Sequence, residues 1–189
     1  SSGSAVTELR VASLTTIHER TSADDGATWS ASAAVVTGLG STVRIGAAQK
    51  SSTVLYLFYC DGATLYSKRR LSGTWEAAAA WTNTVATITG IAASYTTGGD
   101  YSLVLTGTEA TTLDAKVWTC IFGDGLSYSV GVWGPLLELT SANAGSSVSF
   151  SWPGLDKPDV YRCTYIETFS GTGAYKRPQV AHTTPTAAI

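Results

Sequence analysis

The sequence predicts an all-β fold, and three observations carry this prediction. From Glu8 onward, apolar residues alternate with polar ones or run in short stretches, and no segment keeps a helical period over three turns. Turn signals such as Asp61-Gly62 separate these stretches. Charged residues make up only 14% of the chain, well below the usual quarter. We therefore expect short antiparallel strands joined by tight turns.

The expected strands fall into four groups, and short turns join the strands within each group. The first group holds 9–14, 16–22 and 30–36; the second 42–48, 53–60, 64–70 and 74–81; the third 86–95, 101–106, 113–122 and 126–139; the fourth 146–152, 159–168 and 174–182. We expect one all-β domain over residues 1–182, with groups at about 5–37, 41–82, 85–140 and 145–182.

An internal repeat runs through these groups. Tryptophans follow a turn at Trp29, Trp75 and Trp133, spaced 46 and 58 residues apart. A strand marker recurs at Leu9, Leu55, Leu103 and Tyr161, spaced 46, 48 and 58 residues apart. Units of four strands at this period are typical of β-propeller blades, so we expect about four blades or a fragment of a larger propeller. A β-sandwich or jelly roll is the alternative.

The two ends of this repeat are incomplete. The first group lacks an innermost strand and the last lacks an outermost one, so the expected strands make about three and a half blades. Residues 183–189 are expected to be a linker or a strand that closes the ring beside the first group.

One turn carries the strongest local motif, Ser22-Ala23-Asp24-Asp25-Gly26-Ala27-Thr28-Trp29. We expect the Asp24 carboxylate to turn back onto the amides of the loop, and Gly26 to adopt a positive φ. Ser22, Asp24, Gly26, Thr28 and Trp29 match all five fixed positions of a pattern that resembles the Asp-box of sialidase-like β-propellers. The resemblance covers eight residues. It implies a structural turn between the third and fourth strands of a blade, on the face away from the active site.

The resemblance also implies an enzyme alternative, a sialidase-like glycoside hydrolase. Such enzymes use an arginine cluster, a Tyr/Glu nucleophile pair and an Asp acid/base, and the first arginine lies in an Arg-Ile-Pro stretch. Arg44-Ile45-Gly46 lacks the proline and Tyr175-Lys176-Arg177-Pro178 lacks the isoleucine, so no catalytic role is carried onto either. Arg44, Arg162 or Arg177 would have to converge near Glu167 for the enzyme reading to hold. The sequence therefore leans towards a module that is not an enzyme.

Other chemistries are disfavoured by charge and spacing. A net charge of −2 without a basic run argues against nucleic acid, and no apolar run is long enough for membrane insertion. His18 and His182 have no ligand companions at fixed spacing, so neither metal nor cofactor is expected. Cys60, Cys120 and Cys163 are interpreted as buried small apolar residues, with one disulfide and a spare thiol as the alternative.

The remaining signal is aromatic surface, since six Trp and nine Tyr exceed what the turns need, at the loops where propellers usually bind ligands. The candidate ligand-binding residues are Asp61, Trp81, Glu109 and Phe169, although each also has a structural interpretation. We expect a binding or structural module in an extracellular, cell-surface or virion setting, which recognises glycans or a neighbouring protein subunit. A homo-oligomer and a larger parent chain both fit this expectation.

Overall fold

The structure is a computed structural model. It describes the backbone of residues 5–81, 85–95, 100–111, 114–123, 137–144, 147–151, 155–157, 160–168 and 176–183, and side chains chiefly between 5 and 111. Every regular element in these ranges is a β-strand, and none is a helix. The all-β prediction is therefore confirmed. Trp133, Phe169 and residues 184–189 lie outside the described residues.

The N-terminal half forms two antiparallel sheets. Sheet A has the order β1-β2-β3, from Val6–Ser13, Thr16–Ser22 and Ala33–Val36. Sheet B has the order β4-β5-β6-β7, from Ile45–Ser51, Val54–Asp61, Thr64–Leu71 and Thr74–Trp75, and β8 (Ala79–Trp81) also pairs with β6. Each sheet is thus a meander of consecutive strands.

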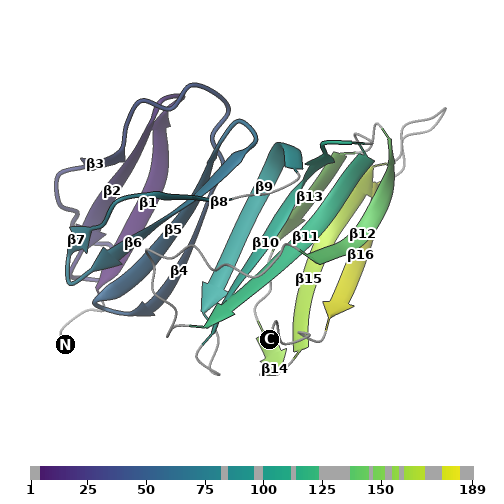
Figure 1. The fold of residues 1–189 in the computed structure, drawn as a ribbon. Helices are drawn as coiled ribbons and strands as arrows, with labels where there is room; N and C mark the ends of the chain where they lie inside the picture. Colours follow the sequence, from purple (N-terminus) through teal and green to yellow (C-terminus); the bar gives the residue numbers. More distant parts are fainter. Residues whose placement is uncertain are drawn as a thin grey trace.

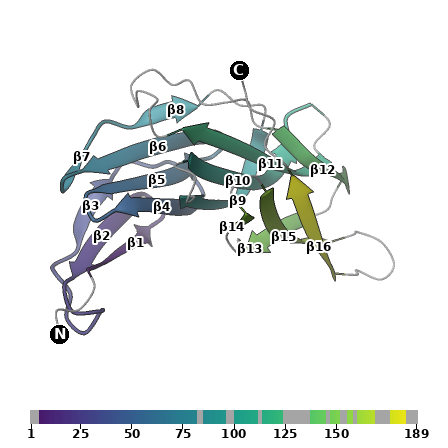
Figure 2. The same ribbon diagram turned by 90° about the horizontal axis from the view of Figure 1, so that it is seen from below.

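The C-terminal half forms two more sheets. Sheet C has the order β12-β11-β10-β9, from Leu137–Ala144, Asp114–Gly123, Asp100–Glu109 and Val85–Tyr95. Sheet D is built on β15 (Val160–Thr168), which pairs with β13 (Ser147–Ser151), β14 (Leu155–Lys157) and β16 (Lys176–Thr183). The four sheets follow one another in chain order across the molecule (Figures 1 and 2).

Sheets B and C pack through a large apolar cluster. Tyr56, Phe58 and Cys60 of β5 meet Tyr101, Leu103 and Leu105 of β10, and all six are 7% exposed or less. Backbone also approaches backbone between β4 and β9, because a Cβ on Gly46 would lie 3.2 Å from the carbonyl oxygen of Ile91. Cys60 is 0% exposed and free, so its interpretation as a buried apolar residue is confirmed.

Sheets A and B pack through a second cluster and a set of polar contacts. Ile17 and Val35 of sheet A meet Leu57 and Tyr59 of sheet B. The Lys68 ammonium donates to the Val35 carbonyl at 2.7 Å, and burial lowers the pKa of that lysine.

The Glu19 carboxylate is a third link between these sheets. It accepts a 2.8 Å hydrogen bond from the Trp75 indole and lies 3.0 Å from the Arg70 guanidinium. Because the Glu19 side chain is only 12% exposed, this contact joins sheet A to sheet B in a partly desolvated setting.

Several strand boundaries differ from the sequence prediction, three of them by a long segment or a break. β3 begins at Ala33 rather than 30, because residues 23–32 form the long connection that contains the box turn. The strand expected over 74–81 is split into β7 and β8, and Glu76 between them turns back to bind Arg69. The strand expected over 126–139 is described only as β12, Leu137–Ala144.

The Leu9–Leu55 spacing does not mark equivalent positions. Both residues line one groove between the sheets, Leu9 from sheet A and Leu55 from sheet B. Leu9 packs against the cluster between the sheets, on the face of sheet A that meets sheet B. Leu55 lies two residues before Leu57 and shares its face, the one by which sheet B meets sheet A. β1 has a register shift between Val11 and Ser13, whereas β5 pairs with β6 without one, so the two residues lie on opposite faces of their hairpins.

Candidate binding site at the loop edge

Three loops meet at one end of sheets A and B, and we call this end the loop edge: residues 13–16, 38–41 and 61–64. The Leu39 amide donates to the Thr15 carbonyl at 3.1 Å. The Gly40 amide and the Ser41 hydroxyl both donate to Oδ1 of Asp61, at 3.1 and 2.7 Å. These bonds join the β1–β2 turn, the link between the sheets and the β5–β6 turn into one surface.

Asp61 lies at the centre of the loop edge because an Asp-Gly turn ends β5. Gly62 has φ of +62°, which lets the chain reverse directly after the carboxylate. Oδ1 holds the neighbouring loop, whereas Oδ2 has no hydrogen-bond partner among the described residues. The half-buried carboxylate is therefore fixed through one oxygen, and its second oxygen has no described partner.

Hydroxyl groups are frequent in the loops of this edge, and the Ser41 hydroxyl contacts the carboxylate directly. The Ser13 hydroxyl lies 3.2 Å from that of Thr15 and 2.8 Å from that of Thr16. Ser41, Ser13 and Thr15 are exposed, and Leu14 at the tip of the β1–β2 turn is 78% exposed. The loop edge is thus a hydroxyl-rich surface with one carboxylate, a suitable composition for neutral polar ligands.

Trp81 and Glu109 are the other candidate residues that the structure describes, and they differ in exposure. Trp81 stands opposite Leu65 in the sheet, yet its indole is 7% exposed, packs edge-on to Phe58 and donates to the Ser67 hydroxyl at 3.0 Å. Its ring is thus held inside the core. Glu109 is the last residue of β10, opposite Val85, and is half-buried. Phe169 lies outside the described residues.

The box turn lies at the opposite end of sheet A, because β2 runs from Thr16 at the loop edge to Ser22 at the box. Asp24 accepts hydrogen bonds from the Ser22 hydroxyl (2.7 Å), the Thr28 amide (2.8 Å) and the Thr28 hydroxyl (2.6 Å). The Ser22 oxygen accepts from the Gly26 amide at 2.8 Å. Asp25 and Gly26 have φ of 56° and 89°. The expected carboxylate contacts and the glycine conformation are confirmed.

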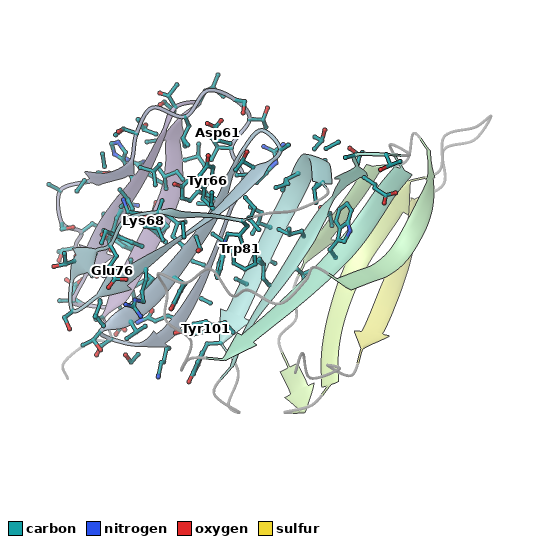
Figure 3. All side chains as sticks on the ribbon, viewed as in Figure 1. Asp61, Tyr66, Lys68, Glu76, Trp81 and Tyr101 are labelled. Carbon is teal, nitrogen blue, oxygen red and sulfur yellow. The ribbon has the colours of Figure 1, made fainter. Side chains whose placement is uncertain are left out.

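The same hydrogen bonds control the ionisation of Asp24. Bonds from Ser22 and Thr28 favour the charged form and lower the pKa of Asp24 to about 2. On the outer face, the Arg20 guanidinium lies 4.4 Å from the ring centre of Trp29. The polar side chains at this end of sheet A are therefore used in structural contacts. In sheet B, Figure 3 places Asp61 and Glu76 at opposite ends.

The arginines required for a sialidase-like site do not gather at one place. Arg44 donates to the backbone carbonyls of Thr89 and Val43, at 3.1 and 3.0 Å. Arg177 stands opposite Glu167 on paired strands, but Arg162 stands opposite His182, further along β15. Arg44 precedes β4, a strand of another sheet. The backbone therefore brings only Arg177 next to Glu167.

Comparison with known proteins adds no family. No protein-family model matches the chain, and no curated protein is detectably similar to it in sequence. Among the described residues, no three His, Cys, Asp or Glu side chains form a group suited to a metal ion. Within the same ranges, no helix combines the length and hydropathy needed to cross a membrane.

The Asp61-Gly62 turn signal in the sequence was enough to identify Asp61 as a candidate residue, but it did not indicate which residues Asp61 binds. Gly40 and Ser41 precede Asp61 by some twenty residues, and the contact exists only because sheets A and B pack together. The run Gly38-Leu39-Gly40-Ser41 signals a loop in the sequence, without indicating which carboxylate it binds.

Proposed function

We propose that this chain is a non-catalytic binding module of the Asp-box class, with a propeller-type arrangement of its four sheets. In sheets A and C each strand pairs with its neighbours in sequence, whereas in sheet D β13 pairs with β15. The chain-order pairing in sheets A and C favours blades over a sandwich or jelly roll. The first strands of sheets B and C lie side by side at Gly46 and Ile91, as the inner strands of neighbouring blades do. The complete hydrogen-bonded box at Ser22–Trp29 supports the same class.

The ligand class we propose is a glycan, bound at the loop edge. The observation that carries this is Asp61, whose Oδ1 is fixed by Gly40 and Ser41 while Oδ2 is open on a hydroxyl-rich surface. Sugar hydroxyls donate to such preorganised carboxylate oxygens, and little conformational entropy is lost because the carboxylate is already held. The low content of charged residues, 14%, supports an extracellular, cell-surface or virion setting.

A glycan array with the full chain tests this function. Asp61→Asn keeps an oxygen for Gly40 and Ser41 but replaces the open acceptor by a donor, so binding to any glycan that is found should fall at least tenfold. Glu76→Gln, at the far end of sheet B, is the matched control and should leave binding unchanged.

Three results would count against this function. The first is an array on which no glycan binds, and the second is a bound glycan whose affinity is unchanged in Asp61→Asn. The third is hydrolysis of a fluorogenic sialoside, which would favour the hypothesis of a sialidase-like enzyme. A neighbouring protein subunit is the second candidate ligand, and the unpaired edge of β1 favours it.

A further inference from the structure

One edge of β1, the edge that does not face β2, has no strand beside it among the described residues, whereas both edges of β5 are paired. β1 pairs with β2 on one side, and no described strand pairs with its other side. β5 lies between β4 and β6, and its residues from Leu55 to Cys60 are all buried. On β1, by contrast, Val6 is 37% and Val11 40% exposed. Exposed apolar residues on an unpaired strand are the usual mark of a strand-acceptor edge.

Sheets B and C show what occupies this position elsewhere in the molecule. β4 pairs antiparallel with β5, and β9 pairs antiparallel with β10, each as the first strand of its sheet. β4 and β9 then lie against each other at Gly46 and Ile91. Sheet A contains three strands and the box turn, but no strand before β1 among the described residues. The position beside β1, which no described strand fills, is the next member of the β4–β9 series.

A groove marks this position. It has a volume of about 370 Å³ and lies between β1 and β4, lined by Thr7, Leu9, Ile45, Gly46, Ala47, Gln49 and Leu55. No lining residue is charged. A strand added to β1 would project every second side chain into this groove, so those side chains must be uncharged.

The β4–β9 contact also limits the size of the incoming residues. β4 carries Ile45-Gly46-Ala47-Ala48, and β9 carries Gly90-Ile91-Ala92-Ala93. A Cβ on Gly46 would come within 2.9 Å of the Ile91 side chain, so small residues are required where these strands cross. A strand packed on β4 from the side of sheet A continues the same interface and meets the same requirement.

We propose that β1 accepts an extended segment of another protein chain, which adds as an antiparallel strand and places small, uncharged residues in the groove beside β4. This deepens the protein-subunit half of the proposed function and rests on it, but it is independent of glycan binding at the loop edge. Main-chain hydrogen bonds to β1 would supply affinity, and the groove would select small side chains.

The test uses the full chain and a synthetic peptide with the sequence of residues 45–49, an uncharged part of β4. We expect the peptide to slow amide exchange in β1 and to bind with a measurable affinity by NMR titration. A control peptide in which the glycine and both alanines are replaced by leucine should bind at least tenfold more weakly.

Two chain variants locate the site. Ala47 is exposed and lines the groove, so Ala47→Trp should fill the groove without disturbing the core and weaken peptide binding at least tenfold. Ala80→Trp, at an exposed alanine of β8 outside the groove, should leave binding unchanged. Both variants should keep the Asp61-dependent glycan binding, so failure of one proposal is distinguishable from failure of the other.

The proposal is overturned if the peptide does not bind at millimolar concentration, if Ala47→Trp binds it as well as the unmodified chain, or if the slowed amides lie outside β1. It is also overturned, in favour of a second copy of this chain, if the peptide fails while light scattering detects self-association that Ala47→Trp abolishes.

Discussion

Sheets A and B turn the chain at the same end in two different ways. Both turns have two consecutive residues with positive φ, Asp25 and Gly26 in sheet A and Ser72 and Gly73 in sheet B. A tryptophan follows each turn, Trp29 and Trp75. In sheet B the strands pair right up to the turn, with Leu71 opposite Thr74. In sheet A pairing between β2 and β3 stops at Glu19 opposite Ala33, and the side chains of the box hold the connection instead.

The difference shows what the Ser, Asp and Thr of the box contribute. A long connection leaves backbone amides without ladder partners, and the box satisfies them with the Ser22 hydroxyl and the Asp24 carboxylate. The two-residue turn in sheet B satisfies its Ser72 amide with the Thr53 carbonyl, so it needs only the glycine and its predecessor in the left-handed region.

The two tryptophans differ as well, and the largest expected effect concerns Trp75. Glu19→Ala removes the acceptor of its indole and the counter-ion of Arg70, both across the interface between sheets A and B. Because this leaves two donors poorly satisfied in a partly buried place, the free energy of unfolding should fall by about 2–4 kcal/mol. Chemical denaturation measures this change.

Glu76→Ala is the matched control for Glu19→Ala. It breaks the ion pair with Arg69, in which both side chains are about a quarter to a third exposed, at 26% and 30%. The loss should be at most about 1 kcal/mol. Equal losses in the two variants would contradict the inter-sheet role of Glu19.

The next effect concerns the box itself. Ser22 is 5% exposed, accepts hydrogen bonds from the Gly26 and Asp24 amides and donates to the Asp24 carboxylate. Ser22→Ala should therefore lower the free energy of unfolding by about 1–3 kcal/mol, measured by urea titration. Ser51→Ala in the exposed β4–β5 turn should change it by no more than about 0.5 kcal/mol. A box variant as mild as this control would show that the box does not stabilise the fold.

A pH dependence should accompany the box. The folded-state pKa of Asp24, about 2, lies below its ordinary value of 3.8, so the carboxylate stabilises the fold above pH 3.8. This contribution is lost as the pH falls from about 4 to about 2. The difference in urea midpoint between the unmodified chain and Asp24→Asn should shrink over that range. A difference that stays constant down to pH 2 would disprove the assignment.

The smallest effect is a gain in sheet B. Ser72 has φ of 48°, a conformation that asparagine adopts more readily than serine. Ser72→Asn should raise the free energy of unfolding by about 0.5 kcal/mol, since the two-residue turn then has the favoured Asn-Gly sequence. Thermal unfolding measures the gain, and Ser72→Val should lower the stability instead. Destabilisation by asparagine would mean that backbone conformation does not limit this turn.

The local structure of the box could be predicted because every contact lies within eight residues. The short polar side chains of Ser22 and Asp24 reach their own loop, and glycine at 26 permits a positive φ. The positive φ of Asp25 was not predicted, because Asp24 and Asp25 are both typical turn residues and the sequence does not indicate which of them adopts the left-handed conformation.

The contacts between sheets could not be predicted in the same way. Asp61 was identified from its turn, but the bonds to Gly40 and Ser41 depend on how the two sheets pack. The 46-residue spacing of Leu9 and Leu55 suggested equivalent positions, yet β1 contains a register shift between Val11 and Ser13, and one extra residue moves a side chain to the other face. The propeller arrangement itself stays a prediction.

Amide hydrogen exchange at Gly26, Thr28 and Ser72 tests most directly whether side chains replace the strand ladder in sheet A. The Ser72 amide donates to the Thr53 carbonyl and serves as an internal reference. Ser22→Ala should speed exchange at Gly26 at least tenfold, and Asp24→Ala should do so at Thr28, whereas Ser72 should exchange as before. Unchanged rates at Gly26 and Thr28 in these variants would contradict the account.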